Sequence, residues 1–81
     1  MKNIRVTLCE FEKSYEPDNM LDIDWPKVQK QIGEDHLEWI YKQAEEDCQL
    51  MLEFSPKGQK SLVVEFYNNQ LAKTYALMWS Q

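Results

Sequence analysis

The chain has little of what small enzymes and metal-binding domains are usually built from: it contains two glycines, two cysteines and one histidine. Two glycines cannot supply a phosphate-binding loop or a nucleophile elbow, because both motifs need glycine at several fixed positions. No CxxC or HExxH motif is present, and the wide separation of Cys9 and Cys48 matches no metal-site spacing. We therefore expect a protein that is not an enzyme and that holds no cofactor and no metal.

The single histidine, His36, lacks a second group with which to bind a metal or relay a proton. On a helix, residues three and four positions away share its face, and here they are Ile32, Gly33, Trp39 and Ile40. None of these side chains ligates a metal. We predict that His36 is an ordinary histidine on a helix surface or in a first helical turn.

Long apolar runs are absent as well. Residues 1–11 alternate apolar and polar side chains, so we expect no signal peptide and no membrane span. In such a chain the two cysteines are expected to be reduced, buried and unreactive, since a free cysteine behaves as a small hydrophobic residue. A disulfide between them is the alternative. Together these features predict a cytoplasmic protein.

Proline is also scarce, at three residues, so no flexible linker is expected, and residues 1–81 are predicted to form a single domain. The hydrophobic fraction of 43% is not that of a disordered chain. A chain of this mass buries roughly 60–65% of the surface that its unfolded form exposes. That is enough for one modest hydrophobic core.

The first regular pattern is an alternation over residues 3–8, with Ile4, Val6 and Leu8 on one side and polar residues on the other. A period of two is typical of a half-buried strand. The phase slips afterwards, because Cys9 and Phe11 are then the apolar members. A β-bulge would produce this slip, and so would a strand that is apolar on both faces.

A helical region follows an irregular loop. Asp24 precedes a Trp-Pro pair, which predicts a helix N-cap with proline in the first turn. The apolar residues before and after Gly33 project on opposite sides of a helical wheel, and glycine often terminates a helix. We predict a short helix over residues 25–32, a break at Gly33 and a longer helix over residues 34–47. A continuous helix buried on two sides is the alternative.

The remainder of the chain predicts three strands. Apolar residues alternate with others over residues 50–54 and 62–67, and turn residues separate these segments at 55–58. The asparagine pair at 68–69 is typical of a hairpin turn, since asparagine tolerates a positive φ, and a last strand is predicted over 71–79. The predicted fold class is therefore α+β: a four-stranded, mostly antiparallel sheet in the order β-α-β-β-β, with one broken helix packed on one face.

Charge is distributed unevenly along the chain. Residues 1–48 carry twelve carboxylates and six bases, whereas residues 49–81 carry two carboxylates and three bases. Such an asymmetry is evidence about partners rather than about fold. A net charge of −6 over the first 48 residues repels phosphate, and the lysines of the second part form no run. We therefore expect a basic protein as the partner and no direct binding to nucleic acid.

Part of this acid is expected to form a partner-binding surface. On the predicted helix 34–47 the carboxylates gather on one side, and Trp39 lies beside them rather than in the core-facing arc. A large aromatic side chain rimmed by charge has the composition of a binding hot spot. An ordinary solvated helix face is the alternative for the carboxylates, and a cover for the short helix is the alternative for Trp39. The predicted surface consists of Asp22, Asp24, Glu34, Asp35, Glu38, Trp39, Glu45 and Glu46.

The second face of the predicted sheet is too apolar for a fully wetted surface. One helical layer cannot cover both faces of the sheet, so we expect that either the loop at residues 14–24 or another protein covers this face. In the second case the protein would be a homodimer joined through this face, with the contacts made by Phe11, Met51, Val63, Tyr67 and Met78.

Two hypotheses for function follow. The first is a small acidic intracellular module that inhibits or neutralises a basic partner protein, for example one that binds nucleic acid. Immunity proteins, phage anti-defence inhibitors such as anti-CRISPR proteins, and nucleic-acid mimics share this profile of small size, acidity and no catalytic motif, which is an analogy of composition. The alternative is a homo-oligomeric scaffolding or ligand-binding protein assembled through the second sheet face.

Overall fold

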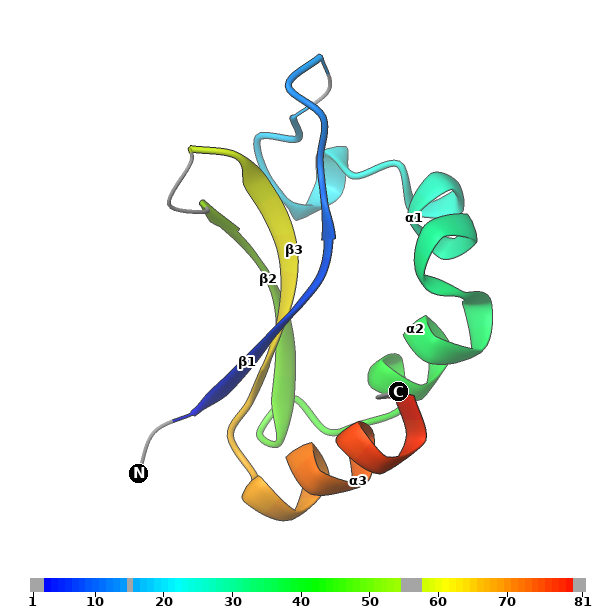
Figure 1. Cartoon of the computed structure of the whole chain (residues 1–81), viewed down its shortest axis with the longest axis vertical. Helices are drawn as coiled ribbons and strands as arrows, with labels where there is room; N and C mark the ends of the chain where they lie inside the picture. Colours follow the sequence, from blue (N-terminus) through cyan, green and yellow to red (C-terminus); the bar gives the residue numbers. More distant parts are fainter. Residues whose placement is uncertain (1–2, 15, 55–57, 80–81) are drawn as a thin grey trace.

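The computed structural model describes residues 3–14, 16–54 and 58–79, and most of the turn predicted at 55–58 lies outside them. The strands are β1 (Ile4–Glu10), β2 (Cys48–Phe54) and β3 (Lys60–Phe66). They form an antiparallel sheet in which β3 lies between β1 and β2. The helices are α1 (Trp25–Ile32), α2 (Glu34–Tyr41) and α3 (Asn69–Trp79), and a short 3₁₀ helix, η1 (Met20–Asp22), precedes α1. Figure 1 shows the three α-helices as an arc on one side of the sheet.

This architecture confirms the α+β class, but the predicted four-stranded sheet is wrong, because the predicted last strand is the helix α3. Ala72 and Tyr75 are buried, and Leu71 and Trp79 pack against the same core cluster. This spacing matches one face of a helix. A strand over 71–79 would also place Leu77 on the same face as Leu71, Tyr75 and Trp79, whereas the Leu77 side chain is 86% exposed.

The turn predicted at 68–69 is instead the start of α3. The Oδ1 atom of Asn68 accepts hydrogen bonds from the backbone N–H groups of Gln70 at 2.9 Å and of Leu71 at 3.3 Å. A helix N-terminus leaves its first N–H groups without partners in the helix, and a side chain of this kind satisfies them. Asparagine is suited both to a hairpin turn and to an N-cap, and this double suitability explains the wrong prediction.

The phase slip in β1 is a β-bulge. Thr7 lies opposite Val63 and Cys9 opposite Leu62, so the register shifts between Thr7 and Cys9. As a result Cys9 packs against a core cluster on the helix side of the sheet, and Phe11 is buried in that cluster. The prediction that Phe11 lies on the second face of the sheet is therefore wrong.

The two helices α1 and α2 are separate, which confirms the break at Gly33. Gly33 has a φ of 108°, in the region that favours glycine. However, α2 ends at Tyr41 and does not continue to residue 47 as predicted. The Gln43 side chain donates a hydrogen bond to the Trp39 carbonyl at 2.8 Å, which satisfies one of the carbonyls that a helix end leaves free. Residues 42–47 form turns that lead into β2.

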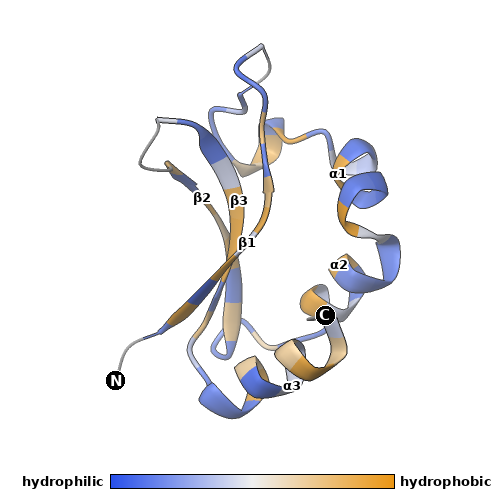
Figure 2. Cartoon of the chain, viewed as in Figure 1, coloured by the Kyte–Doolittle hydropathy of each residue, from blue (hydrophilic) through white to orange (hydrophobic). Residues whose placement is uncertain are grey.

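The core lies between the sheet and the helices, and Figure 2 shows apolar residues along β3 and on the sides of α1 and α2 that are turned toward the sheet. The central strand contributes Leu62, Val64 and Phe66, each at most 1% exposed. Ile23 and Met20, from the loop before α1, join the same core. These residues therefore cover the helix side of the sheet. The prediction that the loop at residues 14–24 covers the second face is wrong.

Candidate functional site

The eight residues of the predicted partner-binding surface do not form one continuous run of acid. Asp22 ends η1, and Asp24 is the N-cap of α1, where its Oδ1 atom accepts a hydrogen bond from the Lys27 N–H at 3.4 Å. Helix α1 separates these two residues from α2 along the chain (Figure 1), and it carries the exposed Lys27 and Lys30. Two positive charges thus interrupt the acidic segment between the loop and α2.

The acid that remains together is on α2. Glu34, Asp35 and Glu38 are exposed, and the first two lie in the first turn, where the helix dipole favours negative charge. The Oε1 atom of Glu38 lies 3.4 Å from Nζ of Lys42, four residues along the helix. Both of these side chains are more than half exposed, so this ion pair adds little to the stability of the fold.

Several carboxylates on α2 and in the turn after it have no cationic partner among the described residues. Glu45 and Glu46 are exposed in the turn after α2. Within the described residues, neither they nor Glu34 and Asp35 form an ion pair, whereas the cations of the sheet pair with other carboxylates. Arg5 pairs with Glu53 and Glu65, and Lys60 pairs with Asp18.

A groove of about 270 Å³ lies between α2 and α3, and we call it the α2–α3 groove. Three residues of the predicted surface, Asp35, Glu38 and Trp39, share this groove. Met78, predicted to lie on the second sheet face, reaches the same groove from α3 and is 51% exposed. The helical state of residues 69–79 therefore joins parts of the two predicted surfaces. The lining residues are Asp35, Glu38, Trp39, Lys42, Met78 and Trp79.

His36 holds Trp79 in the wall of this groove. The two rings stack with centroids 4.5 Å apart and planes 4° apart, and the Nε2 atom of His36 forms a hydrogen bond with the Tyr75 hydroxyl at 2.8 Å. Burial lowers the pKa of His36, and a hydrogen bond with the Ile32 backbone partly opposes this effect. His36 lies in the first turn of α2, as predicted, but it bridges α2 and α3 instead of facing solvent. This role could not be predicted from the sequence, because it depends on residues 69–79 forming a helix.

A second groove of about 380 Å³, the α2–β2 groove, lies between the end of α2 and the edge strand β2. Trp25 and Tyr41 form an aromatic wall, with ring centroids 6.1 Å apart in an edge-to-face arrangement. Sequence spacing did not indicate this groove, because it depends on how the chain folds back at Gly33. Glu45 is the acidic residue of its lining, which consists of Met20, Trp25, Ile40, Tyr41, Gln43, Glu45, Cys48, Gln49 and Leu50.

The five residues predicted to join a homodimer do not lie together on one face. Phe11 is in the core and Met78 is on α3. Met51 and Val63 lie opposite each other on the sheet face turned away from the helices, which we call the outer face. Tyr67 follows β3, and its hydroxyl donates a hydrogen bond to Gln49 at 3.3 Å. Assembly through this face stays a prediction, now with fewer apolar residues to support it.

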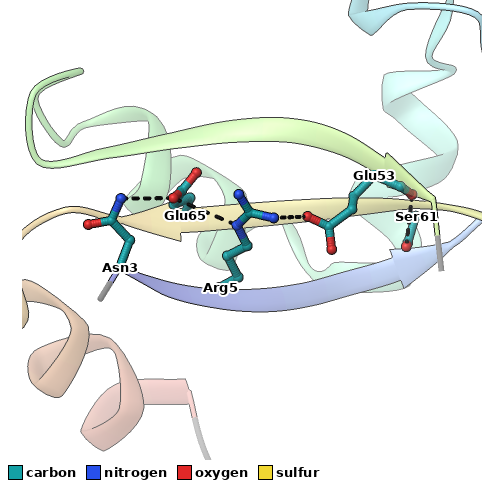
Figure 3. A network of polar contacts seen from close by, with 5 residues as sticks. All are labelled: Asn3, Arg5, Glu53, Ser61 and Glu65. Atoms are coloured by element: carbon teal, nitrogen blue, oxygen red, sulfur yellow. Dashed lines mark hydrogen bonds and ion pairs between the residues drawn. The ribbon is translucent and has the colours of Figure 1, made fainter. Parts of the chain in front are cut away.

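The outer face also carries a network of charged and polar side chains (Figure 3). The Arg5 guanidinium lies 2.5 Å from a Glu53 oxygen and 3.7 Å from a Glu65 oxygen. Asn3 donates a hydrogen bond to the same Glu65 oxygen at 2.9 Å. Glu65 is only 7% exposed, and a buried carboxylate is costly unless it is paired and hydrogen-bonded. The network therefore serves the stability of the sheet.

The two cysteines are free thiols, Cys9 half-buried on β1 and Cys48 buried on β2. These strands are the two edges of the sheet with β3 between them, so the cysteines are too far apart for a disulfide. Burial raises the pKa of both thiols, and at Cys48 the negative charge of Asp47 adds to this effect. The thiolate, which is the reactive form of cysteine, is therefore disfavoured in both.

Within the described ranges, no helix is long and apolar enough to cross a membrane. The same residues contain no group of three or more histidine, cysteine, aspartate or glutamate side chains placed to hold a metal ion. Comparisons with protein-family models, with curated proteins and with solved structures find no match to this chain. The case for function therefore rests on the surface of α2 and the groove beside it.

Proposed function

We propose that this protein is a small acidic binding module that inhibits or neutralises a basic partner protein, and that it binds through α2 and the α2–α3 groove. The observation that carries this proposal is the position of the uncompensated carboxylates. Glu34 and Asp35 are exposed and unpaired in the described part of the chain, and Asp35 lines a groove that also holds Trp39 and Trp79.

The two components of this surface have different tasks. The negative charge attracts a basic partner over a distance and raises the rate of encounter. Trp39, Met78 and Trp79 supply apolar contact area, and tryptophan is among the residues that most often dominate the binding energy of an interface. Leu77, 86% exposed on α3, adds to the apolar surface of this helix.

A partner that binds nucleic acid carries a basic surface of the kind that α2 would attract. By covering that surface, the protein would act as a nucleic-acid mimic and block the partner. Immunity proteins and phage anti-defence or anti-CRISPR inhibitors are the analogous classes. We place the protein in the cytoplasm, where its two free cysteines would stay reduced.

A capture experiment with matched charge variants tests the proposal. The tagged wild-type chain is used to capture proteins from a lysate of its source cells, beside the test variant Glu34→Gln/Asp35→Asn/Glu38→Gln. A control variant removes three exposed charges elsewhere: Glu10→Gln/Glu12→Gln/Asp18→Asn. We expect a basic protein that wild type and control retain and the test variant loses. Equal capture by all three proteins would contradict the proposal.

The salt dependence of the captured complex gives a second test. Exposed charges interact over a distance, the Debye length, that falls from about 10 Å at 0.1 M salt to about 3 Å at 1 M salt. The affinity of the purified partner should therefore fall strongly as salt is raised across this range. An affinity that does not change with salt would show that the α2 carboxylates do not steer the partner.

A further inference from the structure

We propose that the α2–α3 groove receives an arginine side chain of the basic partner. This inference rests on the proposed function and adds the chemistry of its central contact. The groove combines two indole rings with two carboxylates, which are the groups that recognise the two properties of a guanidinium, its flat surface and its charge.

The size of the groove suits one side chain. Its volume of about 270 Å³ lies just below the range of roughly 300–1,000 Å³ typical of pockets for drug-sized ligands and cofactors. Four of its lining residues, Asp35, Glu38, Lys42 and Met78, are exposed, so it is open to a protruding side chain of another protein.

The aromatic walls are held in place before any partner binds. The Trp79 ring stacks on His36, which is itself hydrogen-bonded to Tyr75. The Trp39 ring lies 5.9 Å from the Tyr75 ring, between centroids, and packs against the core cluster that contains Tyr75. Little ordering of the site is therefore needed on binding, which favours affinity.

The carboxylates add the charge. Asp35 and Glu38 are three residues apart on α2, so they lie on the same side of the helix. Lys42 already brings an ammonium group to within 3.4 Å of Glu38. This pair is exposed and therefore weak, so an incoming cation can replace Lys42 at modest cost. Asp35 has no cationic partner among the described residues and is available from the start.

Arginine fits these groups better than lysine does. Its planar guanidinium stacks on aromatic rings and donates several hydrogen bonds in a fixed fork, which suits carboxylates. A lysine ammonium is a compact charge that gains less from a flat indole surface. The combination of two tryptophans with two carboxylates therefore selects for the guanidinium.

The three tryptophans of the chain provide an experiment that does not need the natural partner. The indole N–H signals of the ¹⁵N-labelled full-length protein are followed by NMR during titration with the capped peptide acetyl-Gly-Gly-Arg-Gly-Gly-amide. Trp39 and Trp79 line the α2–α3 groove, and Trp25 lines the other groove and serves as an internal control. We expect saturable shifts at Trp39 and Trp79, little change at Trp25, and weaker binding of the matching lysine peptide.

Charge variants make the test specific. Asp35→Asn and Glu38→Gln should each weaken binding of the arginine peptide by about two- to fivefold, the size expected for one exposed ion pair. Lys42→Met should tighten it by a similar factor, because the competing ammonium is removed. The control Glu10→Gln/Glu12→Gln should leave it unchanged.

Equal shifts at all three tryptophans, equal binding of the lysine peptide, or no effect of the α2 variants would each overturn the arginine site. If the peptide fails in this way while the α2 test variant still loses the captured partner, the proposed function stands without an arginine site. If the peptide binds as expected but no partner depends on α2, the arginine site stands and the proposed function falls.

Discussion

The outer face of the sheet and the exposed side of α2 both carry carboxylates, but the two regions use them differently. On the outer face, Glu53 and Glu65 share the cation of Arg5, and Glu65 is nearly buried. On α2, Glu34 and Asp35 are exposed, and in the described part of the chain no cation pairs with them. The same residue type thus stabilises the fold in one region and leaves negative charge for solvent or a partner in the other.

The difference shows that net charge alone says little about where an acidic protein binds. The placement of its few cations decides which carboxylates remain available. Arg5 compensates two carboxylates on the sheet, whereas Lys42 compensates only Glu38 on α2. An acidic side of the molecule is therefore maintained partly by where the positive charges are absent.

The largest effect is expected when the cation of the outer face is removed. Arg5→Ala removes the ion pair to the buried Glu65, which keeps its hydrogen bond from Asn3, and should lower the free energy of unfolding by about 1–3 kcal/mol. Urea denaturation measures this value. The matched variant Lys42→Ala removes the cation of α2 and should change it by less than about 1 kcal/mol. Equal losses in the two variants would remove the distinction between the regions.

The next effect concerns α3, which provides one wall of the groove. Asn68→Ala removes the N-cap of this helix and should cost about 0.5–2 kcal/mol of stability. The substitution should accelerate amide hydrogen exchange in α3 more than in β1, which carries part of the outer-face network. Gln70→Ala, an exposed change in the first turn of α3, is the control and should be nearly neutral. An unchanged stability of Asn68→Ala would contradict the cap.

The contact between α2 and α3 should make stability depend on pH. Burial lowers the pKa of His36 in the folded state, so the unfolded chain binds a proton more readily than the folded one. The contribution of neutral His36 to the free energy of unfolding is fully present above the pKa of the unfolded chain, about 6.5. It is lost as the pH falls through this value toward the lower pKa of the folded state. His36→Phe keeps a ring against Trp79 and should flatten this dependence in urea denaturation at several pH values. An identical pH profile in the variant would show that His36 does not titrate in this window.

The smallest effect is expected from the exposed carboxylates themselves. Glu45→Gln/Glu46→Gln should change the free energy of unfolding by no more than about 0.5 kcal/mol, because both side chains are exposed outside α2 and neither has an ion pair to lose in the described structure. Thermal or urea denaturation is sufficient to measure this change. A loss of stability as large as that of Arg5→Ala would mean that these charges serve the fold after all.

Much of the fold was predictable from short-range patterns. The alternation of Ile4, Val6 and Leu8 predicts β1, and the change of apolar direction at Gly33 predicts two helices. The segment 71–79 was not predictable in this way, because it is apolar at spacings that fit both a strand and a helix. In the structure Asn68 caps the helix, and the sequence does not distinguish such a cap from a turn.

The candidate site was predictable only in part for the same reason. The exposure of Asp35 and Glu38 follows from their charge and helical spacing. The groove beside them depends on Met78 and Trp79, which a strand would have carried to the sheet. The stack of His36 on Trp79 likewise joins residues far apart in the sequence, and no local pattern indicates it.

The central position of β3 has a consequence for the order in which the protein folds. β2 and β3 are neighbours in the sequence and can form their hairpin locally, whereas the network residues Asn3 and Glu65 are 62 positions apart. Closing so long a loop costs more conformational entropy, and pairings of this kind form slowly. β1 is synthesised before β2 and β3, yet it should be the last of the three to join the sheet.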